Sequence, residues 1–395
     1  MKKISEHRIK RDHKIYSSIY MLILVLIVAG CATSSIAPAP QKSGVTPTSN
    51  VPALSTSARP FPNAAQIDAY LTDLEHHGVL SGSVLVAHDG MLFEKGYDLA
   101  DKDAHIPNTP QTRFRIGSNT KQFTAMAILI LQERGKLHVQ DHICLYVPDC
   151  PQDWQAITIE NLLTHTSGIP DYINSPDFLT FWLKPATPEE LVARFKDLPL
   201  EFKPGSRFKY SNSGYTLLGY IIERVSGESF ATFLQQNIFT PLKLHNTGYD
   251  TTYPALPQHA TGYYQGYIKP APYDPSVLYA AGALYSTVED LNIWDQALMM
   301  HKLVSQPALN AMFTLHIPCP PPGPGGCLQH ADLGYGYGWF IAAEPQGRLI
   351  YHVGHIDGFF TYNGFYPKSN LVVVVLSNLE TTNVLRTGLA LAAMV

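Results

Sequence analysis

Ser118 and Lys121 stand three residues apart in the segment Phe114-Arg-Ile-Gly-Ser-Asn-Thr-Lys-Gln-Phe-Thr124. A serine hydroxyl is a weak nucleophile until a neighbouring base removes its proton. Residues three apart on a helix face the same side, so the lysine amine can reach the hydroxyl. Burial favours the neutral form of such a lysine, which is the form that accepts a proton. The segment therefore predicts a nucleophilic serine with a lysine base.

The same spacing occurs again at Ser206 and Lys209. The first pair is followed by an apolar stretch, Lys121 to Leu131, which predicts a buried helix that begins at the serine. The N–H groups at that end of the helix would face developing negative charge. The second pair has no apolar helix behind it, so we interpret it as part of a loop.

Tyr210 and Asn212 stand just before a helix led by Gly214. A phenol can relay a proton to a leaving group where nearby cations lower its pKa. An asparagine amide can hold a substrate carbonyl. The alternative is a capped loop in which Asn212 only starts the helix. The sequence leaves both interpretations open.

His352, Gly354 and His355 stand at the end of an expected strand. A glycine at that place lets a substrate backbone approach closely, and a cationic His352 would orient an anionic group. The two histidines also suit a metal ion. Because no third ligand stands at a recognisable spacing and no His-Glu-x-x-His occurs, we predict neither a metal site nor a cofactor.

In this order the three segments resemble the Ser-x-x-Lys, Tyr-x-Asn and Lys/His-x-Gly motifs of serine β-lactamases and penicillin-binding DD-peptidases. The tyrosine form is similar to the class C β-lactamase and DD-carboxypeptidase branch. The resemblance runs from about Ala64 to the C-terminus. Further segments that carry it are Leu162 to Pro170, Phe202 to Ser206, Tyr215 to Gly219 and Ala281 to Leu291.

The resemblance implies a role for each motif residue. Ser118 attacks and becomes acylated, and Lys121 is the general base. Tyr210 returns a proton to the leaving group and later activates water, while Asn212 holds an amide or carbonyl of the substrate. The backbone N–H groups of Ser118 and His355 form the oxyanion hole, worth about 3 kcal/mol each.

One position departs from the family pattern. The middle residue of the third motif is usually Thr or Ser, which helps bind the carboxylate of a penicillin or a D-alanine terminus, whereas Val353 has no donor. His352 stands where a lysine or histidine supports the site electrostatically. We expect a Ser118 acyl-enzyme hydrolase, in which a β-lactamase-like or D-alanyl-D-alanine carboxypeptidase-like activity competes with a carboxylesterase. A non-catalytic penicillin-binding sensor is the rival interpretation.

Strand-like runs stand at both ends of the folded region. Two of them flank Asp89-Gly90, a strong hairpin signal, and the β-branched run Val372-Val-Val-Val375 belongs to another. The later runs are Leu349 to His352, Gly358 to Tyr366 and Leu371 to Leu376. Helical patterns cover Ala64 to His76, Gly214 to Val225, Phe230 to Gln236, Thr287 to Met299 and Thr381 to Met394.

These elements predict an α+β domain of the β-lactamase/transpeptidase-like fold class. Its antiparallel sheet is built from both chain ends and has flanking helices, and a mainly helical lobe covers about 137–300. The cleft between the sheet and this lobe is where we expect the site.

The N-terminus carries an export signal. Six Lys and Arg residues within the first 14 positions precede an apolar run from Ile19 to Gly30, which is short for a membrane span. The run ends in Val28-Ala-Gly-Cys31, which resembles the lipobox of bacterial lipoproteins. That resemblance implies removal of residues 1–30 and acylation of Cys31, which gives stable anchoring. The alternatives are an uncleaved anchor or a plain secretory signal.

We therefore expect a protein of the bacterial cell envelope that is lipid-anchored and faces the periplasm. Ala32 after the cysteine suggests the outer membrane, again by resemblance. Residues 31–62 are rich in Ser, Thr, Pro and Ala and predict a flexible tether, and the hydrolase domain covers 63–395. The net charge of −4 and the lack of a basic cluster argue against nucleic acid. The expected substrate is a small-molecule or peptidoglycan-derived amide or ester.

Without Cys31, an even number of cysteines remains for an oxidising compartment. Three pairings are possible for these four residues. We favour the pairing of sequence neighbours, Cys144 with Cys150 and Cys319 with Cys327.

Overall fold

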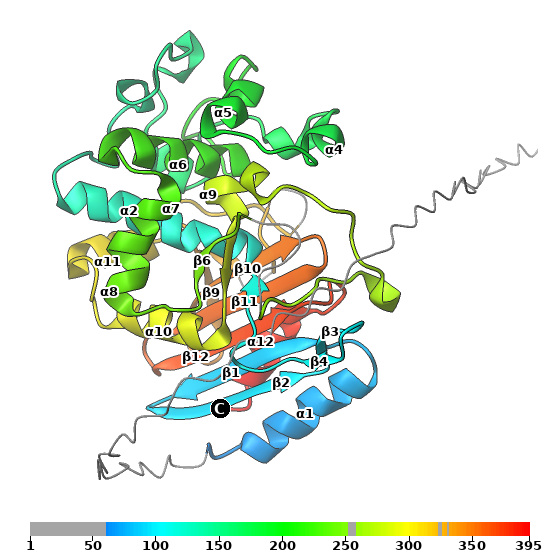
Figure 1. The fold of residues 1–395 in the computed structure, drawn as a ribbon. Coiled ribbons are helices and arrows are strands. Elements are labelled where there is room, and N and C mark those ends of the chain that lie inside the picture. Colours follow the sequence, from blue (N-terminus) through cyan, green and yellow to red (C-terminus); the bar gives the residue numbers. More distant parts are fainter. Residues whose placement is uncertain (1–60, 252–257, 323–325, 330–331) are drawn as a thin grey trace, which may run out of the picture. The chain divides into compact units, whose positions relative to one another are not determined.

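Strands from the two ends of the chain form one seven-stranded antiparallel sheet in the computed structural model, which describes residues 61–251, 258–322, 326–329 and 332–395 (Figure 1). The strand order is β2-β1-β12-β11-β10-β9-β8. The bounds are β1 Gly82–His88, β2 Met91–Tyr97, β8 Asp332–Tyr335, β9 Phe340–Glu344, β10 Gly347–Ile356, β11 Phe359–Tyr366 and β12 Leu371–Ser377. The predicted α+β fold with a sheet from both chain ends is confirmed.

The hairpin of β1 and β2 turns at Asp89-Gly90, as its sequence predicts. Both residues have left-handed φ angles, +48° and +78°, which match the right-handed twist of the paired strands. On its other edge β1 pairs with β12, so that Val86 lies opposite Val373. The N-terminal hairpin therefore adds to the C-terminal strands instead of forming a sheet of its own.

Both faces of the sheet are covered, which explains the unbroken valine run in β12. Helices α1 (Ala64–His76) and α12 (Val384–Ala392) lie on one side of the sheet and pack around Val373 and Val375. Val372 and Val374 point into the larger core on the other side. A strand buried on both faces has no solvent side that would call for polar residues.

The helical part of the chain packs over this second face (Figure 1). Its central elements are α2 (Thr120–Glu133), α6 (Asn212–Ser226) and α9 (Tyr279–Gly282), which contact one another. The remaining helices are α3 Ile159–Leu163, α4 Phe178–Phe181, α5 Pro188–Lys196, α7 Phe230–Leu234, α8 Thr240–Leu242, α10 Val288–Met299 and α11 Gln306–Phe313. A π-helical turn, Gln235–Phe239, follows α7.

The pattern of hydrophobic residues along the sequence does not predict the very short strands. β5 (Phe114–Arg115), β7 (Leu284–Ser286) and β6 (Gly248–Tyr249) form a three-stranded sheet, and β3 (Leu99–Asp101) pairs with β4 (Ile106–Pro107). Two or three residues hold too few alternations to reveal a strand. β5 nevertheless matters for function, because it leads the chain into the Ser118 segment.

The disulfides join Cys144 to Cys150 and Cys319 to Cys327, which is the pairing of sequence neighbours that we favoured. Cys31, the expected signal peptide and nearly all of the expected tether lie outside the described residues. Within the residues that the structure describes, no helix combines the length and apolar character needed to cross a membrane.

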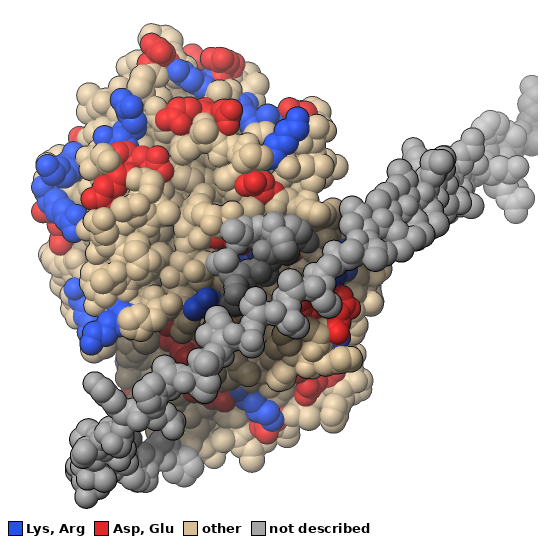
Figure 2. Space-filling model, in the orientation of Figure 1, with Lys and Arg blue, Asp and Glu red and all other residues tan. Residues whose placement is uncertain are grey.

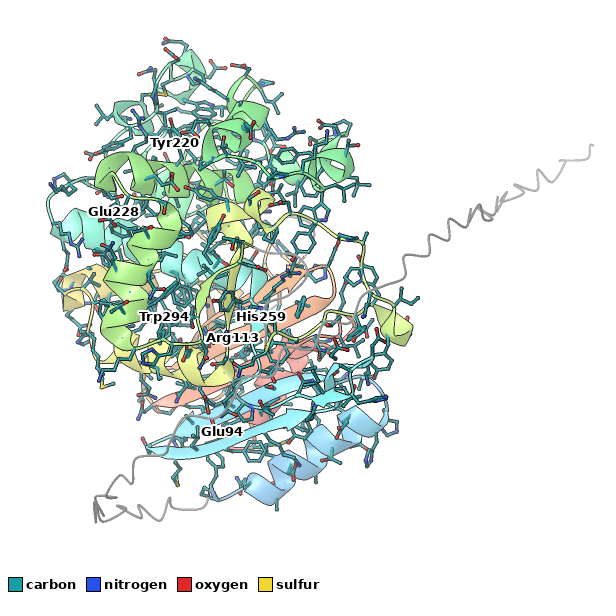
Figure 3. All side chains as sticks on the ribbon, viewed as in Figure 1. Glu94, Arg113, Tyr220, Glu228, His259 and Trp294 are labelled. Carbon is teal, nitrogen blue, oxygen red and sulfur yellow. A yellow bond between two sulfur atoms is a disulfide. The ribbon has the colours of Figure 1, made fainter. Side chains whose placement is uncertain are left out.

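A chain of buried hydrogen bonds fixes the Ser118 segment to the sheet. The Asn119 amide donates to the Thr361 hydroxyl on β11 at 2.9 Å and accepts from the Gln122 amide at 2.9 Å. The Gln122 carbonyl oxygen accepts from the Trp294 indole on α10 (Figure 3) at 3.1 Å and from the Asn363 amide at 3.2 Å. The start of α2 is thus tied to β11 and to α10 beneath the nucleophile.

The far end of this hydrogen-bonded chain is Asp295, which is fully buried and accepts from the Asn363 amide at 3.0 Å. Among the described residues, Asp295 Oδ2 and Asn363 Oδ1 have no hydrogen-bond partner. Burial raises the pKa of Asp295 well above its usual value. The unfolded chain therefore releases this proton at lower pH than the folded chain does, and folding is penalised as the pH rises.

We predict that Asp295→Asn raises the free energy of unfolding at pH 8 by about 2 kcal/mol, since the amide carries no charge and supplies a donor. The gain shrinks towards pH 4, where the unfolded carboxyl is itself partly protonated. Urea denaturation at both pH values measures this, with the exposed Asp103→Asn as control. An equal gain at both pH values would rule out ionisation of Asp295 as the cause.

Candidate active site

The nucleophile and its base lie at the junction of a 3₁₀ turn and a helix. Ser118 is in the turn Gly117–Asn119, and α2 begins at Thr120, two residues after the position we expected. The Lys121 Nζ is 3.0 Å from the Ser118 Oγ. The serine is half-buried whereas the lysine is fully buried, so the hydroxyl meets the solvent side and the amine approaches it from the interior.

Lys121 contacts two further acceptors, Asn212 Oδ1 at 2.9 Å and the carbonyl oxygen of Ala281 at 2.8 Å. Burial lowers the pKa of Lys121 to about 7, although the Asp171 carboxylate acts in the opposite direction. A neutral amine has two hydrogens, one for each of these acceptors. Its lone pair is then directed to the Ser118 hydroxyl, which is the arrangement that a general base requires.

Asn212 has both of the roles between which the sequence did not decide, the start of a helix and a part of the site. It is the first residue of α6, and its side chain also enters the site. The amide nitrogen donates to Asp171 Oδ2 at 3.0 Å, and the backbone N–H donates to the same oxygen at 3.1 Å. The Lys121 amine requires a hydrogen-bond acceptor and the Asp171 carboxylate requires a donor. These two neighbours therefore fix which way the Asn212 side-chain amide is turned. One amide hydrogen is left for a substrate carbonyl.

Tyr210 hydrogen-bonds to Ser118, and its ring centre lies 4.8 Å from the Lys121 Nζ. The condition named from the sequence, a pKa lowered by nearby cations, is not met, because burial raises the pKa of this phenol. The phenol therefore stays protonated at neutral pH. A protonated phenol beside the nucleophile can donate its proton to a leaving group, and it then needs a new proton from Lys121.

His165 positions Tyr210, although the sequence assigned no role to this histidine. Its carbonyl oxygen accepts from the Lys209 N–H at 2.9 Å, and its Nδ1 accepts from the Ser211 N–H at 3.2 Å. Its ring lies 4.3 Å from the Tyr210 ring. His165 has a left-handed φ of +58°, and burial lowers its pKa well below the usual value. One neutral histidine thus holds both residues that flank the tyrosine.

His352 is brought to the site, but the expectation that it is cationic is wrong. Its Nδ1 lies 2.6 Å from the carbonyl oxygen of Val353 and must donate to it, so Nε2 accepts from the Tyr335 hydroxyl at 3.0 Å. Burial and the charge of Lys121 lower the pKa of His352 to about 3. The imidazole is therefore neutral and cannot attract an anionic group by charge.

Gly354 serves the protein rather than the substrate, contrary to our expectation. A Cβ atom at this position would lie 1.8 Å from the carbonyl oxygen of Ile116 and 2.5 Å from the Thr361 hydroxyl. The space that a glycine leaves here is filled by the main chain that precedes the nucleophile. The glycine lets β10 approach the Ser118 turn closely.

The next residue, His355, lies beside the nucleophile turn, where the family resemblance implies the second N–H of an oxyanion hole. Gly117 has a φ of +50°, and a Cβ atom there would lie only 3.0 Å from the His355 nitrogen. Ser118 and His355 border the same two hollows. The His355 side chain points away and contacts Glu380 at 2.9 Å, so this residue contributes its backbone to the site. Two N–H groups beside one hydroxyl suit a tetrahedral oxyanion.

Two hollows meet at Ser118. One, of about 510 Å³, is lined by Tyr210, His352 and Val353. The other, of about 220 Å³, is lined by Phe178, Trp182, Leu278 and other apolar side chains. The family resemblance implies that Tyr210 protonates the leaving group, so we expect the leaving group in the first hollow and the acyl group in the second.

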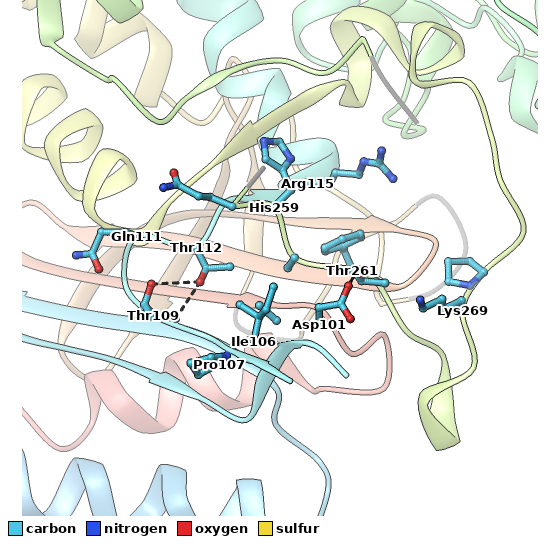
Figure 4. A pocket seen from close by; sticks show the side chains of 16 residues that line it. Asp101, Ile106, Pro107, Thr109, Gln111, Thr112, Arg115, His259, Thr261 and Lys269 are labelled. Carbon is cyan, nitrogen blue, oxygen red and sulfur yellow. Dashed lines mark hydrogen bonds between the residues drawn. The ribbon is translucent and has the colours of Figure 1, made fainter. Parts of the chain in front are cut away.

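A hollow larger than these two, of about 570 Å³, contains none of the motif residues (Figure 4). Arg115 lines it and donates to Asp250 at 2.5 Å, and Thr261 donates to Asp101 at 2.9 Å. Burial lowers the pKa of His259 in its wall to about 4. These polar groups stabilise one another, and the hollow holds no activated nucleophile. Size therefore does not identify the active site here.

On the face shown in Figure 2, the described residues have no concentration of charge of one sign. Basic and acidic side chains are interspersed there. In the described part of the chain, no group of three or more His, Cys, Asp or Glu side chains is placed to hold a metal ion.

The sheet and the site together define the β-lactamase/transpeptidase-like class of serine hydrolases. The family model described as Beta-lactamase matches residues 66–394, and the chain belongs to this family. A putative penicillin-binding protein of Bacillus subtilis, PbpX, is 34% identical over 76% of this chain and 71% of its own length. Protein flp of Staphylococcus aureus is 31% identical over 80% of this chain, which spans only 63% of that protein.

Solved structures agree with the sequence relatives. The D-amino acid amidase of Ochrobactrum anthropi SV3, determined with D-phenylalanine, has a TM-score of 0.69 and 26% sequence identity. The similarity covers 80% of this chain and 91% of that one. The predicted family is confirmed, and it includes proteins named for penicillin binding and for amide hydrolysis.

We predict that acylation of Ser118 accelerates as the pH rises through about 7, because the neutral form of Lys121 is the base. Asp171→Asn removes a negative charge that favours the ammonium, so it lowers the pKa of Lys121 and moves the midpoint to more acidic pH. The rate of labelling by a fluorophosphonate between pH 5.5 and 9 measures both. The exposed Asp177→Asn is the control, and a shift of Asp171→Asn towards alkaline pH would contradict this electrostatic account.

Proposed function

We propose that this protein hydrolyses amides or esters through an acyl-enzyme on Ser118. The observation that carries the proposal is the distance of 3.0 Å between the Lys121 Nζ and the Ser118 Oγ, in a site where burial lowers the lysine pKa to about 7. A base with a pKa near the ambient pH balances a sufficient neutral fraction against proton affinity.

The contacts support a complete sequence of proton transfers. Lys121 takes the proton of the Ser118 hydroxyl while Oγ bonds to the substrate carbonyl carbon. The N–H groups of Ser118 and His355 bind the resulting oxyanion. As the bond to the leaving group breaks, Tyr210 donates its proton to that group and recovers one from Lys121. Water then attacks the acyl carbonyl carbon; Tyr210 takes the proton of the water as it passes its own to Lys121, which is neutral again. The bond from that carbon to Oγ breaks, Oγ takes the proton from Lys121, and the acid leaves with the Ser118 hydroxyl restored.

The leaving-group hollow supports a substrate without a carboxylate at that side. Val353 has no donor, and the His352 imidazole is neutral. Lys209 is the basic side chain in this wall, and its Nζ lies 2.5 Å from Glu201 Oε1. We therefore infer an amidase or esterase activity in preference to cleavage of β-lactams or D-alanyl-D-alanine termini, whose leaving side carries a carboxylate.

The place of action follows from the N-terminus. We infer that Cys31 is lipidated after cleavage of residues 1–30, and that residues 31–62 hold the domain at the periplasmic side of a membrane. A hydrolase held there meets small amides and esters and fragments released from peptidoglycan. Cell fractionation of the wild type and of Cys31→Ser tests this placement, since the variant should leave the membrane fraction.

We predict that Ser118→Ala lowers hydrolysis of p-nitrophenyl butyrate by roughly 10⁴-fold or more, as removal of a catalytic nucleophile does elsewhere. Intact-mass spectrometry should show the added butyryl group on the wild type only. Ser206→Ala is the matched control, because this serine has the same spacing to a lysine but lies outside the site. It should retain full activity.

Turnover of nitrocefin and of a D-alanyl-D-alanine peptide, measured on the same preparation as the ester, distinguishes β-lactamase-like and carboxypeptidase-like activity from esterase activity. We expect both to react more slowly than the ester. Faster turnover of either would reject the inference of a substrate without a carboxylate, and a stable adduct with nitrocefin would indicate a penicillin-binding sensor. No adduct on Ser118 with any of the three would refute the proposed hydrolase.

A further inference from the structure

The acyl hollow has one acidic side chain in a mostly apolar wall. Its walls include Tyr172, Phe178 and Trp182 on one side, and Leu278 and Ile356 on the other. Asp357 lines the same hollow as Ser118. His355 and Ile356, which precede it in the chain, line this hollow too.

Asp357 has hydrogen-bonding capacity left for a ligand. The Tyr264 hydroxyl hydrogen-bonds to its carboxylate. A carboxylate offers about four acceptor positions, and this contact uses one. No lysine or arginine of the described residues forms an ion pair with Asp357. Asp357 is half-buried, so its negative charge is partly shielded from water without a basic partner.

Asp357 has an acidic neighbour, Glu380, that already has partners within the protein. Glu380 lies close by and is engaged by the His355 imidazole at 2.9 Å and by the Gly358 N–H at 3.2 Å. Burial and the charge of Glu380 both raise the pKa of Asp357, while His355 acts in the opposite direction. Glu380 is thus engaged within the protein, and Asp357 is the carboxylate left to contact a ligand.

The turn that carries Asp357 is held in place from two sides. The Gly358 carbonyl oxygen accepts from the Tyr263 N–H at 3.2 Å. Gly358 has a left-handed φ of +80°, and a Cβ atom there would lie 2.6 Å from the main chain at Gly262. The carboxylate is therefore presented by a fixed turn, which suits a specificity site better than a loose surface acid does.

We propose that Asp357 binds a protonated amine on the acyl part of the substrate, so that the preferred substrates are amides or esters of amino acids with apolar side chains and a free amino group. This inference rests on the proposed function of Ser118. The hollow of about 220 Å³ suits one side chain of that kind. The neighbouring carboxylate and apolar wall would receive the amino group and the side chain separately.

The test compares two substrates that differ only in the amino group. Phenylalanine p-nitroanilide, in both configurations, is compared with 3-phenylpropanoyl p-nitroanilide, and p-nitrophenyl butyrate reports the basic activity. We expect the wild type to prefer one phenylalanine anilide by about tenfold or more in kcat/KM, the effect of one charge-assisted hydrogen bond. Asp357→Asn should remove this preference and leave hydrolysis of the butyrate ester within twofold of the wild type.

Asp103→Asn serves as the matched control, because Asp103 is an exposed acid paired with Lys269 outside the acyl hollow. It should keep the preference. Equal turnover of the amino and des-amino anilides by the wild type would overturn the amine site, as would an Asp357→Asn variant that loses both equally. If the butyrate ester is still hydrolysed, the Ser118 chemistry stands; if no ester acylates Ser118, the proposed function itself fails.

Discussion

The burial of one amine is the constraint on which the rest of the site depends. Lys121 lies wholly inside the protein, where an ammonium ion loses its hydration. Three polar atoms, from Ser118, Asn212 and Ala281, contact its amine. The same burial that makes the amine a base requires that α2, α6 and α9 converge on it. If one of these helices were displaced, water would enter and the amine would return to its ordinary pKa.

The sheet supplies the other half of the site by close approach of main chains. Gly117 and Gly354 both lack a side chain where β10 passes the nucleophile, and the Thr361 hydroxyl donates to the Ile116 carbonyl oxygen at 3.0 Å in the same place. The oxyanion N–H groups come from these two main chains. Their spacing is therefore set by backbone contact, which is stiffer than contact between long side chains.

The features that could be predicted from the sequence are those set by neighbouring residues and by the catalytic motifs. Asp89-Gly90 specified its hairpin, and the apolar helix after Ser118 separated the true Ser-x-x-Lys pair from the one at Ser206. Features that depend on long-range packing were missed. Ala281 acts through a carbonyl oxygen, which every residue has, and His165 acts through contacts with residues more than 40 positions away. The neutral state of His352 follows from burial, which its neighbours in sequence do not reveal.

The two neutral histidines explain how the site keeps a single positive charge. His165 and His352 both lie near Lys121, and the charge of Lys121 lowers the pKa of each. As the pH falls, the first proton therefore goes to the amine, with its pKa of about 7, long before it goes to His352, with its pKa of about 3. A second lysine at position 352 would add a permanent cation and attract carboxylates on the leaving side. With histidine there, that side is neutral, and the charge that selects a substrate lies across the nucleophile, at Asp357.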